Sequence, residues 1–254
     1  MSPLAVSLTI LGCVFASAVV GVLLRPRFPD DHLSADTKDV VKLVMGVVGT
    51  MTGIVLGLLV ASAKGSFDGQ REGVAQLAAN VVVLDRTLAH YGPEAQDVRD
   101  SLRGTAADMV RRMWPDEPPP PGATDHPGED GGRYDDVYHR LLGLQPKSDA
   151  QRTTQAQALK VVHDTAQLRW QLYARRGTSV PSIFLVLLVA WLSVTFASYG
   201  LFAPRHGTTF VVLFLGAFVV SSAVFLFLEL DQGFGGTVQI SSAPLRNAIH
   251  QLGK

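Results

Sequence analysis

Four long stretches without a charged side chain constrain this chain more than any other feature of its sequence. None contains Asp, Glu, Lys, Arg or His, and each is 20 or 21 residues long, which is the length that a helix needs to cross the hydrocarbon core of a bilayer. Charged residues make up only 17% of the chain, whereas soluble domains carry about 25%. The sequence therefore predicts an all-α integral membrane protein with four transmembrane helices.

The charge balance and the cysteine content argue against a nucleic-acid-binding protein, a disulfide-bonded protein and a thiolate metal site. The 22 basic and 22 acidic side chains balance, so there is no basic excess for a nucleic-acid partner. The single Cys13 lies inside the first apolar stretch and cannot form an internal disulfide or a thiolate metal cluster.

The run V-F-A-S-A at Val14 to Ala18 looks like a signal-peptidase site, but the apolar stretch continues past it to Leu24. We expect an uncleaved anchor.

The apolar stretches and the prolines divide the chain. Pro26 and Pro29 end the first helix, whereas no proline stands between Pro29 and Pro93, so the second helix can continue beyond the membrane as one long rod. The predicted parts are transmembrane helix 1 in 1–24, a polar connection in 25–42, helix 2 in 43–63, a soluble helical region in 64–182, helix 3 in 183–203, a tight connection in 204–208, helix 4 in 209–228 and a C-terminal tail in 229–254.

The soluble region carries the pattern of a helical hairpin between helices 2 and 3. Apolar residues after the second span recur at alternating spacings of three and four, which is the seam of a helix packed against another. They are Val74, Leu77, Val81, Leu84, Leu88 and Tyr91. Ser148 and Gln151 form a capping box for a later helix whose apolar side is expected to complement that seam. This side carries Leu159, Val162, Ala166 and Tyr173.

The segment 115–132 is much richer in proline, glycine and acidic residues than the helical segments around it. It holds six prolines, four glycines and five acidic residues, too little apolar surface to offset the entropy lost on ordering. We therefore expect a disordered loop there, between two helices of the soluble region.

Small residues recur every fourth position along the second span. Gly49, Gly53, Gly57 and Ala61 form this stripe, and Thr50 adds a hydroxyl. Such stripes usually allow helices to approach closely in lipid. The alternative is that helix 2 lines a passage in a symmetric oligomer, where small residues set the width and apolar neighbours form a constriction that gates by dewetting. Both interpretations stay open at this point.

Signatures of catalysis and of coupled transport are absent from the sequence. There is no G-x-S-x-G, phosphate-binding loop, H-E-x-x-H or G-x-G-x-x-G motif, so we expect no enzyme activity and no cofactor. Asp135 and His139 are four residues apart, but a zinc site needs at least three ligands, and we expect no metal. No charged residue occupies the middle of a span, which argues against an active transporter.

The exit of the fourth span combines acidic residues with glycines. Glu229 and Asp231 follow the last apolar stretch, and glycines occur at 233, 235 and 236. The plainest interpretation is a membrane stop with a flexible turn. The alternative is that Asp231 accepts backbone N–H bonds from the turn through Phe234 to Gly236, while Phe234 packs on the bundle and couples the tail to helix 2. In that case neutralising Glu229 would have no effect.

Three stretches resemble the bestrophin-like-domain family of mostly bacterial membrane proteins. They are VLGLLVASAKGSFDGQRE from Val55, LDRTLAHYGPEA from Leu84 and FLFLELDQGFGGTVQISSAPL from Phe225. Asp231, Phe234 and Gly236 fit the family's turn after helix 4, although Gly233 stands where a proline is expected. The resemblance implies a distantly bestrophin-like fold, since true bestrophins are pentameric anion channels whose second helix lines the pore. Their calcium-binding acidic cluster has no counterpart here beyond Glu229 and Asp231.

These observations lead to one functional hypothesis and one rival. We expect a passive, anion-type channel formed by a homo-oligomer, by analogy a pentamer, around helix 2 in the bacterial inner membrane. The rival is a non-conducting membrane-anchored scaffold or sensor whose helical hairpin binds a protein. Basic residues flank the two sides of the membrane almost equally, so the positive-inside rule hardly decides orientation. The resemblance favours a cytoplasmic location for both termini and the central region.

Overall fold

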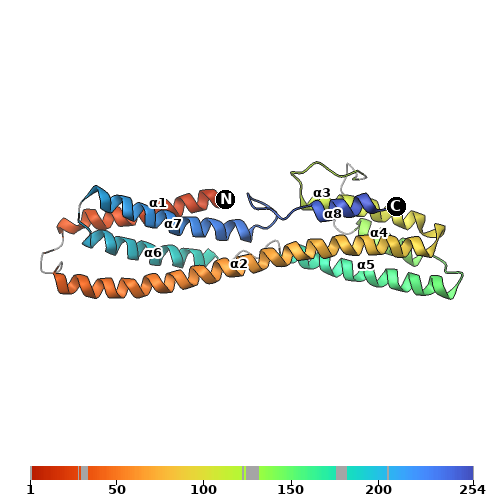
Figure 1. Ribbon diagram of the computed structural model, residues 1–254, viewed down its shortest axis with the longest axis horizontal. Coiled ribbons are helices and arrows are strands. Elements are labelled where there is room, and N and C mark those ends of the chain that lie inside the picture. Colours follow the sequence, from red (N-terminus) through yellow and green to blue (C-terminus); the bar gives the residue numbers. More distant parts are fainter. Residues whose placement is uncertain are drawn as a thin grey trace. The chain divides into compact units, whose positions relative to one another are not determined.

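The computed structural model describes residues 2–27, 29, 34–121, 123, 132–175, 182–204 and 206–253. Every regular element in these ranges is a helix, as predicted. The chain forms two compact units, one comprising Met1–Phe67 with Ser179–Val238 and the other Asp68–Thr178 with Gln239–Lys254. Figure 1 shows the helices of each unit.

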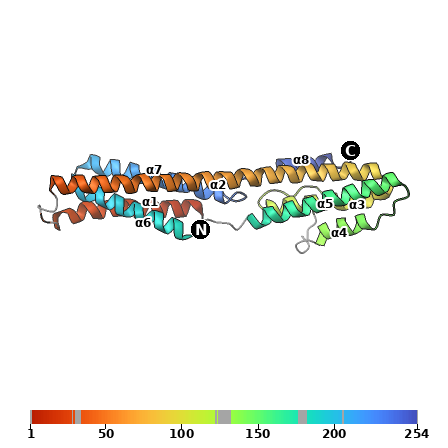
Figure 2. The same cartoon turned by 90° about the horizontal axis from the view of Figure 1, so that it is seen from below.

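The first unit contains the four apolar helices. They are α1 (Pro3–Leu24), the N-terminal part of α2 (Ala35–Tyr91), α6 (Ser182–Phe202) and α7 (Gly207–Asp231). All four are long and apolar enough to span a membrane, which agrees with the prediction of four spans. In Figures 1 and 2, α1, α6 and α7 lie side by side. Their shared core includes Val14, Ala18, Leu188, Phe196 and Val224.

Two glycines allow α1 and α6 to approach at backbone distance. A Cβ added to Gly21 would overlap the carbonyl of Ala197, and one added to Gly200 would overlap the carbonyl of Ala18. Near the other end of α1, the Ser221 hydroxyl of α7 donates to the Ser7 carbonyl at 2.5 Å. Close backbone approach through small residues is the usual means of packing helices in lipid, so this crossing is the tightest contact of the first unit.

The second span is part of a much longer helix. α2 runs for 57 residues from Ala35 to Tyr91, so the prediction of one continuous rod is confirmed. The helix ends at Gly92, whose φ of 124° is difficult for any residue with a Cβ. Pro93 then begins a short 3₁₀ helix, Pro93–Ala95, in the first-turn position that suits a residue without an N–H.

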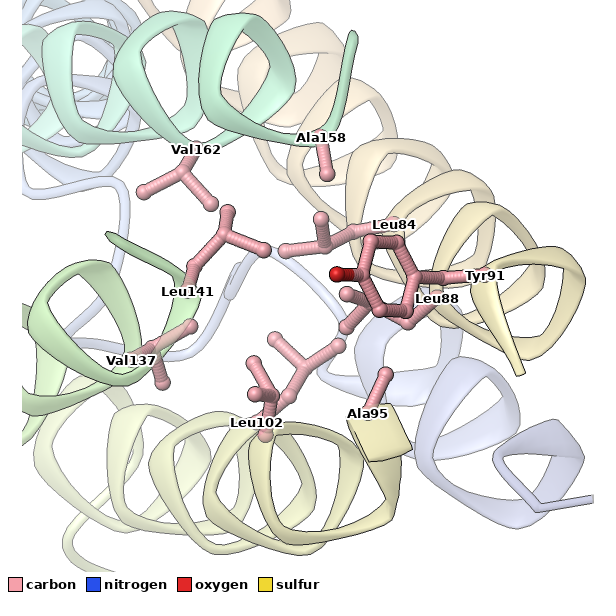
Figure 3. Close-up of a cluster of buried hydrophobic side chains, with 10 residues drawn as sticks. Leu84, Leu88, Tyr91, Ala95, Leu102, Val137, Leu141, Ala158 and Val162 are labelled. Carbon is pink, nitrogen blue, oxygen red and sulfur yellow. The ribbon is translucent and has the colours of Figure 1, made fainter. Parts of the chain in front are cut away.

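The second unit contains five helical segments, four of which share one core. The C-terminal part of α2 is joined by α3 (Gln96–Met113), α4 (Gly132–Leu142), α5 (Asp149–Arg175) and α8 (Ala243–Gln251). Figure 3 shows side chains from α2, α3, α4 and α5 meeting in this core. All six residues of the predicted seam are buried, and Val162 of α5 packs in the same cluster. The predicted hairpin of α2 and α5 is therefore incomplete, because α3 and α4 fill the rest of the core.

The capping box of α5 also connects two helices. The Ser148 hydroxyl accepts the Gln151 N–H at 3.2 Å, and the Gln151 side-chain oxygen accepts the N–H of Lys147 at 2.7 Å. The Gln151 amide nitrogen donates to the Tyr91 carbonyl at 3.0 Å. One side chain therefore caps the start of α5 and satisfies a carbonyl at the end of α2.

The loop predicted to be disordered, 115–132, includes residues at its N-terminal end that make hydrogen bonds to α8 and the residue before it. The Glu117 carboxylate accepts hydrogen bonds from Ser242 at 2.5 Å and from Arg246 at 3.0 Å. The Pro118 carbonyl accepts another from Arg246 at 2.6 Å. These bonds tie the beginning of the segment to α8, and α4 begins at Gly132. Residues 122 and 124–131 lie outside the described ranges, so disorder there stays a prediction.

Candidate functional site

The candidate pore-lining or packing residues lie on a part of α2 that their own chain leaves uncovered. A Cβ added to Gly49, Gly53 or Gly57 meets no atom within 4 Å, and Thr50 and Ala61 are exposed. These five residues form what we call the small-residue face. The structure brings all of them together on one side of the helix, as their spacing predicted. Among the residues that the structure describes, however, nothing lies within 4 Å of a Cβ added to any of the three glycines.

A different side of α2 makes the contacts to the first unit. Val55, Leu56 and Leu59 are partly buried and pack against the core of α1, α6 and α7. Thr52 is 3% exposed. The helix is therefore held to its own bundle through its bulky residues, and this attachment makes no use of the glycines.

Large apolar residues border the small-residue face. Val47, Met51, Ile54 and Leu58 are all more than half exposed, and no ionisable side chain occurs between Leu43 and Ala63. The Thr50 hydroxyl donates to the Gly46 carbonyl at 2.9 Å, so its proton is used within the helix. This surface has no group for acid–base or nucleophilic chemistry. It can present only width, apolarity and helix dipoles to a partner or an ion.

The exit of α7 forms an ordered turn. Glu229 is 3% exposed, and its carboxylate accepts the N–H of Thr237 at 2.6 Å and of Val238 at 3.2 Å. Gly236 has a φ of 106°, and a Cβ placed on it would press against that carboxylate. Carboxylates bonded by backbone N–H groups are among the stronger hydrogen-bond acceptors in proteins. Glu229 therefore fixes the first residues of the tail.

This geometry corrects the sequence-based prediction that Glu229 is dispensable. The alternative interpretation gave the backbone N–H bonds of the turn to Asp231, whereas Glu229 accepts two, from Thr237 and Val238, just after Gly236. Asp231, at the end of α7, and Phe234, in the turn, are half-buried, and the glycines at 233 and 236 have positive φ. The coupling of Phe234 to helix 2 stays a prediction. The missed signal was the place of Glu229, two residues before Asp231 and directly after the apolar stretch.

A second group of polar contacts fixes the C-terminus within the second unit. Arg99 Nε and Nη2 donate to the two Asp85 oxygens at 2.8 and 3.0 Å, which is the bidentate geometry of a strong ion pair. The Gly253 N–H donates to Asp85 Oδ2 at 3.3 Å, and Arg103 donates to the Leu252 carbonyl at 2.5 Å. We call this group the C-terminal clasp.

Burial and hydrogen bonding shift the pKa of the Asp85 carboxyl in opposite directions. Burial by itself would raise the pKa of the carboxyl, but the hydrogen bonds from Arg99 and Gly253 outweigh it and hold the pKa below its ordinary value. The ion pair is thus intact at neutral pH. The sequence did not reveal the clasp, because neither the pairing across the Gly92 turn nor the contact with Gly253 follows a local spacing rule.

The weak metal candidates gain no support. Asp135 and His139 are both exposed on α4, and the His139 ring packs edge to face with Tyr138. Within the described ranges, no group of three or more His, Cys, Asp or Glu residues is arranged to hold a metal ion.

Comparison with known proteins gives a family and a fold. The bestrophin-like domain matches residues 12–245. A crystal structure of a bacterial bestrophin homologue from Klebsiella pneumoniae superimposes with a TM-score of 0.72 at 15% identity, covering 96% of both chains. A point variant of that homologue gives a TM-score of 0.71 at 16% identity over 99% of this chain and 97% of the other. A further crystal structure, of a membrane protein, gives 0.71 at 14% identity over 96% of both chains. No curated protein matches the sequence. Because the domain spans nearly the whole chain, this multi-pass membrane protein belongs to the bestrophin-like family.

Proposed function

We propose that this protein is the subunit of a passive, anion-type ion channel, formed by a homo-oligomer in which copies of α2 surround a central pathway. The observation that carries the proposal is the uncovered small-residue face. Glycine weakens a helix by up to about 1 kcal/mol per residue, and an added Cβ at these glycines meets no atom of another described segment within 4 Å, so no described contact within the protomer offsets this cost. Contacts between several copies of α2, or a pathway between them, would account for these glycines.

The chemistry of this face suits passive conduction. Small residues set the width of a pathway, and exposed apolar neighbours such as Met51, Ile54 and Leu58 supply a constriction that controls flow by dewetting. Proton- or ion-coupled transporters usually place titratable side chains within their spans, and none of the four apolar stretches here has one. Anion preference is inferred from the family, since true bestrophins are anion channels.

Assembly and orientation follow the same analogy. We propose five copies per channel, in the bacterial inner membrane, with both termini and the central region in the cytoplasm. A reporter enzyme fused after Lys254 tests the orientation, and activity confined to the periplasm would reverse it. Averaged electron micrographs of particles in detergent test the copy number through their rotational symmetry.

Conduction is tested by chloride efflux from liposomes that contain the purified protein. We expect efflux from the wild type and an altered rate for Gly57→Ala. Gly12→Ala is a matched control, because Gly12 in α1 is also a helical glycine whose added Cβ meets no atom within 4 Å. An altered rate for Gly57→Ala alone supports a pathway along the small-residue face. Correctly assembled protein that conducts neither anions nor cations contradicts the proposal and favours the scaffold or sensor.

A further inference from the structure

We propose that one membrane phospholipid binds to each protomer at the end of the first unit where α2 begins, with its phosphate on Lys38 and Lys42 and its acyl chains on either side of Tyr199. The proposal does not depend on ion conduction. It rests on two neighbouring hollows, on the order of polar and apolar residues along them, and on the cations at their rim.

The two hollows meet at the C-terminal end of α6. One, of about 110 Å³, is lined by α2 and α6 residues that include Lys38, Lys42 and Met45. The other, of about 390 Å³, is lined by α6 and α7 residues that include Thr208 and Val212. Tyr199 and Ala203 line both, so the two hollows are neighbours that share an aromatic side chain in their lining, and we call the pair the groove. A ligand with two chains fits this shape.

The lining residues change from polar to apolar along each hollow. Lys38 and Lys42 lie in the first turns of α2, before or at the edge of the predicted span, whereas Met45 lies inside it. In the second hollow, Thr208 and Thr209 begin α7, and Val212 and Leu213 follow one turn later. The same order of depth therefore appears on two separate helices. An amphipathic molecule oriented like the surrounding lipid matches both.

Cationic groups gather at the polar end. Lys38 and Lys42 are one helical turn apart, and Arg25 Nη1 donates to the carbonyl of Ala203 at 2.7 Å, next to the groove. Asp39 lies 3.7 Å from Lys42, but both side chains are more than half exposed, so this pair contributes little. A phosphodiester can compete for the Lys42 ammonium. Lysine ammonium groups bind phosphate oxygens as point charges, through charge-assisted hydrogen bonds.

The position of Tyr199 is typical of the membrane–water interface. Its side chain is 40% exposed and lies three residues before the end of α6, where tyrosine and tryptophan are enriched in membrane proteins. Phe196, one turn deeper, contacts its ring edge to face, with centroids 6.4 Å apart. Tyr199 therefore contributes an interfacial aromatic side chain to the lining of both hollows, which suits a lipid with one chain in each.

The test compares phospholipid retained by full-length variants in native mass spectrometry after detergent exchange. We expect the wild type to keep one phospholipid per protomer and the Lys38→Gln, Lys42→Gln double variant to lose it. Ser198→Phe should also lose it, because Ser198 lines the narrower hollow. Arg27→Gln is the matched control, since Arg27 is an exposed cation at the same end that lines neither hollow.

A thermal-shift series on the same proteins distinguishes binding of a whole phospholipid from binding of a phosphate group alone. Palmitoyl-oleoyl phosphatidylglycerol should raise the melting temperature of the wild type and of Arg27→Gln, and have a smaller effect on the double variant. Inorganic phosphate and glycerol 3-phosphate should have no effect. Equal retention by all variants overturns the proposal, as does equal stabilisation by inorganic phosphate. A change in oligomer size with unchanged lipid retention also overturns it and assigns the groove to a contact between copies.

Discussion

Two sets of glycines in the membrane helices differ completely in their surroundings. Gly21 and Gly200 lie where α1 and α6 touch at backbone distance, and neither has room for a methyl group. Gly49, Gly53 and Gly57 in α2 have no atom of the chain within 4 Å of an added Cβ. The first set is required by the protomer. The second is unexplained by the protomer, which indicates a role in contacts or a pathway formed by several copies.

The largest expected effect is at the α1–α6 crossing. Gly21→Ala places a methyl group against the Ala197 carbonyl, a backbone atom that cannot rotate away. Overpacking commonly costs about 1–3 kcal/mol, and we expect Gly200→Ala and Gly21→Ala to reach or exceed the upper end. Thermal unfolding in detergent, followed by tryptophan fluorescence, measures this loss. Gly12→Ala should unfold like the wild type, and equal behaviour of all three variants would contradict the close crossing.

A substitution on the small-residue face should separate folding from assembly. Gly53→Leu has space within the protomer, so the monomer should fold and keep its secondary structure, whereas the oligomer should dissociate or lose conductance. Size-exclusion chromatography and liposome efflux measure the two outcomes. Gly12→Leu is the matched control on α1. Normal assembly and conductance for Gly53→Leu would remove both the packing and the pore interpretation of this face.

A third kind of glycine is tested at the exit of α7. Gly236 has a φ of 106° and lies against the Glu229 carboxylate, so Gly236→Ala is strained in two ways, and we expect a loss of about 1–3 kcal/mol. Glu229→Gln removes the charge from two backbone hydrogen bonds, and bonds to charged groups contribute about 1.5–3 kcal/mol. We expect it to lower the melting temperature by a similar or smaller amount. Gly235→Ala, where an added Cβ has room, provides the control.

The smallest expected effect concerns pH and the C-terminal clasp, where Gly253 has a φ of 82°. The folded pKa of Asp85 lies below its ordinary value of 3.8. Its contribution to stability is therefore fully present above the ordinary value and is lost as the pH falls through the lower folded pKa. Unfolding measured from above pH 3.8 down through more acidic values should show this loss in the wild type. Asp85→Asn is less stable throughout and should show a weaker dependence on pH in the acidic range.

The sequence by itself determined the features that depend on local spacing. The four spans follow from uninterrupted apolar stretches, and the long α2 follows from the absence of proline between Pro29 and Pro93. The buried seam that ends at Tyr91 follows from alternating spacings of three and four residues. Each of these rests on interactions within one helix or on the transfer of its side chains out of water. Such properties can be read from neighbouring residues.

Only the tertiary structure decided which polar and small residues matter. The stripe of α2 drew attention because it repeats, yet the glycines in closest contact are Gly21 and Gly200, which are single and far apart in the chain. Neutralising Glu229 was expected to have no effect, but the fold brings the N–H groups of Thr237 and Val238 to its carboxylate. Asp85 similarly meets Arg99 and Gly253 from separate segments. Contacts of this kind depend on how helices cross, and a crossing is fixed by the joint packing of many side chains, so no local pattern specifies it.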